Sequence, residues 1–254
     1  MRALLTALLT GLLLLGATPA SAAPEPLPAD LDRWDYQIGG PRAVGDRVDV
    51  VVRDREARPA GVYDVCYVNA FQTQPGEQRF WRERWSLVLK DGRGRPVVDA
   101  GWGEWLLDIR TAAKRQRLAR IVGGWFAGCA ADGYEAVEPD NLDSFSRSRG
   151  HLDRADARAF ARLLVARAHA ADLAIAQKNW AELDGSRLGF DFAVAESCAR
   201  WRECDRYATA YDGAVLAVEY DAPSFRRACA RWADDVAVVR RDRAVTPRGV
   251  RRWC

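Results

Sequence analysis

The segment EAVEPDNLD, residues 135–143, decides the fold and indicates where a functional site lies. It opens as a short β-like run, Glu135–Pro139, and continues into acidic and amide residues. Glu138 and Asp140 are two positions apart, so in an extended strand they lie on the same side. Asp143 adds a third acid, and acids this close repel one another unless a ligand, a cation or a pKa shift compensates. We therefore interpret the segment as a β-strand whose C-terminal end carries a functional site.

Runs of the same kind recur along the chain and alternate with helical patterns. The clearest helical patterns are Ala112–Phe126 and Arg154–Ala170, where small and apolar residues recur at helical spacing. Near-continuous apolar strands that alternate with helices are typical of a parallel sheet covered on both faces. Eight such units favour a single α/β domain with a (β/α)₈ TIM-like barrel. The expected strands are Trp34–Ile38, Val48–Val52, Val62–Val68, Trp105–Ile109, Glu135–Pro139, Leu173–Gln177, Phe190–Ala195 and Ala214–Val218, and a ninth run, Val236–Val239, closes or extends the sheet.

The alternative fold is an open doubly wound sheet, but no G-x-G-x-x-G motif follows a strand to support a dinucleotide-binding version of it. A net charge of +3 gives no indication of nucleic-acid binding. The chain has only two histidines, which argues against a histidine-rich zinc site and against a Ser-His or Cys-His hydrolase. A G-x-S-x-G motif is also absent.

The N-terminal residues have the three parts of a secretory signal peptide. Arg2 precedes an apolar run, Ala3–Leu15, and residues 20–22 form an A-x-A end. The run is shorter than the about 20 residues that a membrane span needs, although an N-terminal anchor helix is the alternative. We expect cleavage of residues 1–22, a flexible lead-in over residues 23–33 and one barrel domain over residues 34–254. The mature protein would be secreted and extracellular, without stable membrane insertion.

Six cysteines in an exported chain indicate disulfide bonds. A short loop after the seventh expected strand holds two of them, and a bond there would fix the orientation of Glu196. A bond from the last helix would hold the C-terminus in place. Cys66 and Cys129 either pair with each other or stay as buried thiols. The two expected bonds are Cys198–Cys204 and Cys229–Cys254.

Acids and amides gather where the expected strands end, which is where barrel enzymes build their active sites. Basic residues lie instead on helices, as in residues 114–120, so the barrel would have an acidic mouth that attracts a cationic substrate. For any single acid, capping of the next helix is the alternative. Tryptophan and tyrosine near strand ends would pack on sugar rings or ammonium groups, unless they fill the core. The expected substrate-binding residues are Asp35, Gln37, Tyr67, Asp108, Glu138, Asn141, Asp143, Lys178, Asn179, Glu219 and Tyr220.

Two segments, VEPDNLD at residues 137–143 and FDFAVAESC at residues 190–198, resemble glycoside hydrolase family 114, the endo-α-1,4-polygalactosaminidases. The resemblance implies a TIM-like barrel that cuts α-1,4-linked galactosamine polymers internally, and it places the catalytic pair on Asp140 and Glu196. The chain departs from many relatives at residues 69–75 and at Ala195, near the expected cleft, which bears on the sugar that is bound. Further matching segments, in the order of the family, are residues 34–37, 65–69, 104–110, 177–179, 203–204 and 218–221.

Hydrolysis of a sugar bond needs one carboxyl group to protonate the leaving oxygen and a second to attack the anomeric carbon or activate water. We expect Asp140 to be the ionised nucleophile or base, Glu196 to be the acid, and Lys178 to keep Asp140 charged or to bind a substrate hydroxyl. The enzyme would act as a monomer on an amino-sugar polysaccharide, with no cofactor and no metal. The alternatives are a carbohydrate-binding protein without catalysis and a divalent-metal hydrolase that uses Glu138, Asp140 and Asp143.

Overall fold

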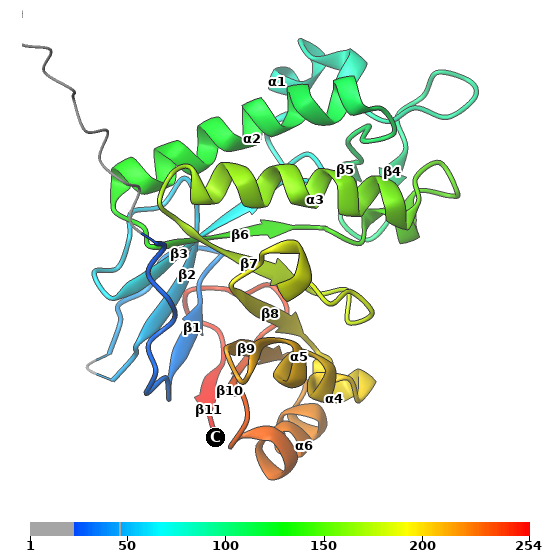
Figure 1. Ribbon diagram of the computed structural model, residues 1–254. Coiled ribbons are helices and arrows are strands. Elements are labelled where there is room, and N and C mark those ends of the chain that lie inside the picture. The colour runs from blue at the N-terminus through cyan, green and yellow to red at the C-terminus, as the bar shows by residue number, and fades with distance from the viewer. Residues whose placement is uncertain (1–22, 46) are drawn as a thin grey trace, which may run out of the picture.

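The computed structural model describes residues 23–45 and 47–254, and the expected signal peptide, residues 1–22, lies outside them. One nine-stranded sheet curls into a nearly closed barrel (Figure 1). Eight of its strands are parallel neighbours, and the last, β11, pairs antiparallel with β10, which confirms the α/β barrel expected from the sequence. In sheet order the strands are β1 (Trp34–Tyr36), β2 (Val50–Asp54), β3 (Tyr63–Asn69), β6 (Ala136–Asp140), β7 (Ala174–Lys178), β8 (Phe192–Glu196), β9 (Val215–Glu219), β10 (Ala237–Arg241) and β11 (Arg251–Trp253).

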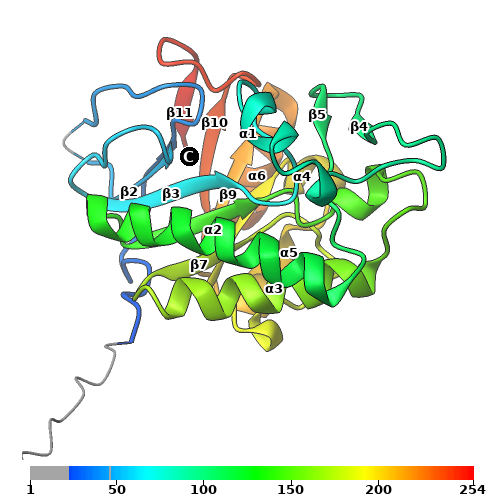
Figure 2. The ribbon, with the colours of Figure 1, turned by 90° about the horizontal axis from the view of Figure 1, so that it is seen from above.

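Helices cover the barrel unevenly. α2 (Ala112–Asp132) and α3 (Arg154–His169) pack side by side over β3, β6 and β7 (Figures 1 and 2). α4 (Cys198–Trp201), α5 (Cys204–Tyr211) and α6 (Ala222–Trp232) pack along β8, β9 and β10. In the residues described, the connections from β1 to β2 and from β2 to β3 contain no helix, so the barrel has fewer helices than strands.

The two long helices begin where the sequence supplies a cap. The side chain of Thr111 accepts a hydrogen bond from the Lys114 backbone N–H at the start of α2, and Asp153 forms a capping box with Asp156 at the start of α3. Such caps satisfy backbone N–H groups that a helix leaves unpaired. α2 ends at Gly133, which has a φ of 92° that glycine adopts without steric cost. The remaining short elements are α1 (Gln78–Arg82) and the 3₁₀ turns η1 (Trp85–Leu87), η2 (Ser144–Arg147) and η3 (Ser186–Leu188).

Residues of each strand alternate between two apolar cores. In β8, Phe192 and Val194 belong to a core inside the barrel, whereas Ala193 and Ala195 belong to a second core between the sheet and the helices. The strands β3, β7 and β9 divide their residues in the same way. This alternation follows from the period of two in a β-strand. It also decides which strand-end side chains continue the inner face and reach the mouth of the barrel.

The seam between the first and last strands is closed by side chains. The Trp34 indole donates to the carbonyl of Ala237 on β10 at 3.0 Å, and the Trp253 indole on β11 donates to the carbonyl of Trp34 at 2.7 Å. Asp35, whose side chain is fully buried, forms ion pairs of 2.7 Å with Arg241 and 2.9 Å with Arg251. These bonds join strands that are not paired through their backbones.

The expected strand Trp105–Ile109 is wrong as a barrel strand. Glu104–Trp105 forms the short strand β5, which pairs antiparallel with β4 (Val98–Asp99) in a separate two-stranded sheet. Leu106 and Leu107 form single antiparallel bridges to Gln72 and Val88. Leu106, Leu107 and Ile109 are apolar because they bury into the core outside the barrel. The eighth parallel strand is β10, so the ninth expected run, Val236–Val239, takes the place of Trp105–Ile109.

Three disulfide bonds join all six cysteines. They include the two expected from the sequence, Cys198–Cys204 and Cys229–Cys254, and the third joins Cys66 on β3 to Cys129 on α2.

The N-terminal segment that was expected to be flexible lies against the barrel. Leu27 and Leu31 pack on the inner core, and the Tyr63 hydroxyl donates to the Glu25 carbonyl at 2.7 Å. Within the residues that the structure describes, no helix has both the length and the apolarity needed to cross a membrane.

Candidate active site

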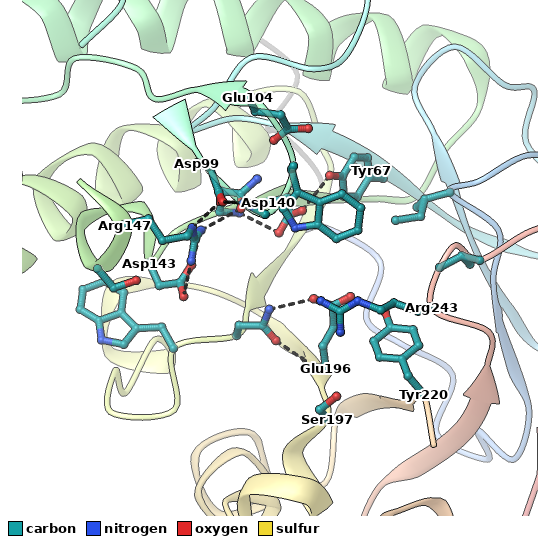
Figure 3. Close-up of a pocket in the computed structure, with 18 of the residues that line it drawn as sticks. Tyr67, Asp99, Glu104, Asp140, Asp143, Arg147, Glu196, Ser197, Tyr220 and Arg243 are labelled. Atoms are coloured by element: carbon teal, nitrogen blue, oxygen red, sulfur yellow. Dashed lines mark hydrogen bonds and ion pairs between the residues drawn. The ribbon is translucent and has the colours of Figure 1, made fainter. Parts of the chain in front are cut away.

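A cavity of about 980 Å³ opens at the C-terminal ends of the parallel strands (Figure 3). Side chains at or just after the ends of β3, β6, β7, β8 and β9 line it. Eight acids face four arginines in the lining, which gives the cavity an excess of negative charge and attracts cations. Two tryptophans of the lining, Trp102 and Trp201, are 60% and 65% exposed, and the Arg200 guanidinium lies over the ring of Trp201. The acids are Asp54, Asp99, Glu104, Asp140, Asp143, Glu182, Glu196 and Glu203.

One buried ammonium group lies at the centre of the acids. The Lys178 Nζ, at the end of β7, is 2.7 Å from Glu138, 3.3 Å from Asp140 and 3.8 Å from Glu196. It also donates to the Tyr36 hydroxyl at 2.7 Å. Burial acts to lower the pKa of Lys178, but the charges of the three carboxylates outweigh burial and hold this pKa well above its usual value. Lys178 therefore stays protonated and fixes the positions of the carboxylates around it.

Asp140, the last residue of β6, is stabilised as an anion. Its Oδ2 accepts a hydrogen bond from the Tyr67 hydroxyl at 2.7 Å, and its Oδ1 accepts from the Asn141 backbone N–H at 2.7 Å. Burial works to raise the pKa of Asp140, whereas the Lys178 charge and these hydrogen bonds lower it, and the net pKa lies below the usual value. A carboxylate in this state is suited to act as a nucleophile or a base.

Glu196, the last residue of β8, faces Asp140 across the cavity (Figure 3). Its Oε1 accepts from the Tyr220 hydroxyl, and its Oε2 accepts from the Asn179 side-chain amide at 3.1 Å. The same amide group accepts from the Glu196 backbone N–H at 2.8 Å, so Asn179 holds both the main chain and the carboxyl group. The Glu196 side chain is 29% exposed, against 17% for Asp140, and is the more open of the two to a ligand.

Glu138 lies beneath this pair and is closed off from solvent. Its Oε1 accepts hydrogen bonds from Lys178 and from Tyr36, at 2.7 and 2.9 Å, and the residue is 0% exposed. Burial raises the pKa of Glu138 to about 7, against the opposing effect of the Lys178 charge. Glu138 therefore orients Lys178 from below and does not line the cavity.

A second cluster forms around Arg147, on the turn after β6. Its guanidinium contacts Asp143 at 2.9 and 3.0 Å, Asp99 at 2.7 Å and the Asn141 side-chain oxygen at 2.9 Å. Asn141 also donates to Asn69 at 3.0 Å and has a φ of 67°. This conformation turns the chain sharply after Asp140, and the cluster around Arg147 holds it there.

The structure brings most of the predicted residues to the cavity or directly beneath it, and four lie elsewhere. Asp35 closes the barrel seam, and Gln37 donates to Asp35 at 2.8 Å from the same outer side. Asp108 pairs with Arg110 and Lys114 before α2, because its segment is not a barrel strand. Glu219 accepts from the Ala199 backbone N–H at 2.7 Å and supports the start of α4. None of these four lines the cavity.

The sequence did not single out Asp99, Glu104 and Arg147 as site residues. Asp99 and Glu104 reach the cavity on the hairpin of β4 and β5, which is inserted between β3 and α2. Only Glu104 carried a signal, because it lies in one of the segments that match family 114. Arg147 lies in a polar turn where nothing in the local pattern marks a cation that contacts several acids.

The contacts of the acidic segment bear on the metal-hydrolase alternative. Glu138 and Asp140 pair with Lys178, and Asp143 pairs with Arg147, so each carboxylate proposed as a metal ligand already has a cation. Among the described residues, one group of three has metal-ligand spacing, Cys198, Cys204 and Glu219. Its two cysteines are joined in a disulfide and do not offer thiolates.

Comparison with known proteins identifies the family. The sequence matches the model of glycoside-hydrolase family GH114 over residues 16–254. The chain belongs to this family. The membership confirms the resemblance seen in the sequence and the expected glycoside hydrolase on a barrel fold. A search of curated proteins found no match.

Two solved structures share the fold. Ega3 of Aspergillus fumigatus, in a crystal structure with galactosamine, is 22% identical, with a TM-score of 0.74 over 92% of this chain and 99% of that chain. The glycoside hydrolase domain of PelA from Pseudomonas aeruginosa is 16% identical, with a TM-score of 0.58 over 87% of this chain and 98% of that chain. At these identities the likeness concerns the fold.

Proposed function

We propose that this protein is a secreted, endo-acting glycoside hydrolase that cleaves α-1,4-linked galactosamine-containing polysaccharide with Asp140 and Glu196. One observation carries the proposal: both carboxylates face an open acidic cavity while sharing the buried Lys178 ammonium at 3.3 and 3.8 Å. Two carboxyl groups flanking a sugar bond are the machinery of most glycosidases. The two distances to Lys178 keep the nearest carboxylate oxygens no more than about 7 Å apart.

The two carboxyl groups take different roles because their surroundings differ. Asp140 receives the stronger anionic stabilisation and acts as the nucleophile or base. Glu196 is farther from the ammonium and more open to the cavity, and it donates a proton to the leaving oxygen. Tyr67 and Lys178 hold Asp140, and Asn179 and Tyr220 hold Glu196, so neither carboxyl group has to reorganise during the reaction.

The choice of an amino-sugar polymer has two supports. The cavity has four more acids than arginines, which favours a polycationic ligand. Ega3, which has a similar fold, was crystallised in complex with galactosamine. Three disulfides and the signal-peptide pattern of residues 1–22 support export to a place where such polymers occur.

The direct test is to incubate residues 23–254 with deacetylated galactosamine polymer, N-acetylated galactosamine polymer and chitosan, and to read the products by mass spectrometry. We expect internal cleavage of the deacetylated galactosamine polymer and none in a matched Glu196→Gln sample. Binding of the polymer without any cleavage would instead identify a carbohydrate-binding protein of the same fold. Cleavage of chitosan alone would overturn the proposed substrate.

A further inference from the structure

The β4–β5 hairpin brings to the cavity a carboxyl group without a cation. Asp99 and Glu104 lie opposite each other in the register of the hairpin, and facing like charges destabilise a strand pair. Asp99 is compensated by Arg147 at 2.7 Å and by the Gln72 amide at 3.2 Å. Among the described residues Glu104 forms no ion pair, and Arg147, whose charge acts on it from beyond ion-pair distance, is paired with Asp99 and Asp143.

The surroundings of Glu104 favour a ligand with a positive charge. The residue is 9% exposed, its Oε2 accepts one hydrogen bond from the Asn69 amide at 2.9 Å, and its Oε1 accepts none from a described residue. Burial raises the pKa of Glu104 to about 7, reinforced by the charges of Asp140 and Asp99 and opposed by the Asn69 hydrogen bond and the charge of Arg147. A buried carboxylate that lacks a cation is costly, so a ligand cation at Oε1 would be bound strongly.

Glu104 also lies in the right place to meet a sugar at the catalytic pair. Asn69, which donates to Glu104, is the register partner of Asp140 on the neighbouring strand, and Figure 3 shows Glu104 beside Asp140 on the same side of the cavity. Trp102, two residues before Glu104, is 60% exposed and lines the cavity. An exposed indole face of this kind packs against a sugar ring.

We propose that Glu104 is a specificity-determining residue that binds the ammonium group of an unacetylated amino sugar held at Asp140, and so selects it over the N-acetylated sugar. The inference rests on the proposed hydrolysis of amino-sugar polymers and adds the residue that distinguishes the free amine. An N-acetyl group is neutral and bulkier, and it would leave the Glu104 carboxylate buried without a charge partner. The discrimination would therefore act on the substrate bound beside the scissile bond.

The test compares kcat/KM for galactosamine oligomers with free amines and for the same oligomers N-acetylated. In the wild-type protein the ratio favours the free amine. Glu104→Gln keeps the shape and the Asn69 contact but removes the charge, and we expect the ratio to fall roughly 10- to 100-fold, the value of a charged hydrogen bond. Glu56→Gln is the matched control, because it removes one exposed acid that does not line the cavity, and it is expected to leave the ratio unchanged.

The outcomes separate this inference from the proposed function. If the wild-type protein cleaves neither oligomer, the proposed function fails. If it cleaves the free-amine oligomer and folded Glu104→Gln keeps the wild-type ratio, the role of Glu104 is overturned. If Glu104→Gln does not fold, Glu104→Asp serves as the second variant, because it keeps the charge but withdraws it by one methylene. We expect Glu104→Asp to lower the ratio by a smaller factor, and an unchanged ratio overturns the inference.

Discussion

Replacing Lys178 by methionine removes the one cation that three carboxylates share. At an effective dielectric constant of about 20, unit charges at the 3.3 Å separation of Lys178 and Asp140 interact by about 5 kcal/mol. Even if relaxation and water entry cancel three quarters of this energy, about 1 kcal/mol remains, which corresponds to roughly one pH unit. We therefore expect the pKa of Asp140 to rise by at least about one unit in Lys178→Met.

The pH dependence of kcat/KM measures this shift, because its acidic limb follows the base of the free enzyme. In the wild-type protein Lys178 lowers the pKa of Asp140, so the variant should lose activity at a higher pH as the solution is acidified. Lys114→Met is the matched control, because it breaks a lysine–aspartate pair outside the cavity and leaves Asp108 its bond to Arg110. An acidic limb that stays in place in folded Lys178→Met would refute the central role of Lys178.

The Lys178→Met variant should also be less stable than the wild-type protein. Breaking a buried ion pair on one side costs about 3–5 kcal/mol, which lowers the Tm of a chain of this size by roughly 6–20 °C. Without Lys178, the folded-state pKa values of Glu138 and Asp140 lie above those of the unfolded chain, so folding stability falls as pH rises. The loss of Tm should be larger at pH 8 than at pH 5. An equal loss at both values would contradict the electrostatic cause.

Three further outcomes are expected. Asp140→Asn and Glu196→Gln should each lower cleavage at least about 100-fold while the protein stays folded, and near-wild-type rates in either would contradict the assignment. Cleavage of a polycationic polymer should fall as salt approaches 1 M, where the Debye length is about 3 Å, whereas a rate insensitive to salt would argue against an acidic cleft. Asp35→Asn should cost about 3–5 kcal/mol in denaturant unfolding, because it leaves buried Arg241 without its main partner. A cost below about 1 kcal/mol would contradict a role in closing the seam.

The core of the candidate site could be predicted from local patterns. Asp140, Lys178 and Glu196 each end a short apolar run, and parallel strands bring their C-terminal ends to one edge. Glu138 and Asp140 were expected on one side of a strand, and both contact Lys178. These predictions needed only the alternation of side chains along a strand and the order of the strands in the chain, and both can be inferred from the sequence pattern.

The β4–β5 hairpin and the Arg147 cluster could not be predicted in the same way. Residues 105–109 form an apolar run like the others, yet they bury against the outside of the barrel. Composition does not distinguish an apolar run that joins a sheet from one that covers it. The contacts of Glu104 and Arg147 join segments about 35 to 48 residues apart in the sequence, such as Asn69 with Glu104 and Asp99 with Arg147, and depend on that placement.

Strand parity accounts for most of the predicted residues that miss the cavity. Trp34 and Tyr36 face the inner core. Because side chains alternate along a strand, Asp35 and Gln37 face outward. Likewise Val218 faces inward and Glu219 faces outward. The sequence alone does not assign this parity, because parallel strands are apolar on both faces and show no polar side to mark the outside. Two polar residues on one face do not decide the matter either, because Glu138 and Asp140 in β6 point inward to Lys178 whereas Asp35 in β1 and Gln37 just after it share a face that points outward.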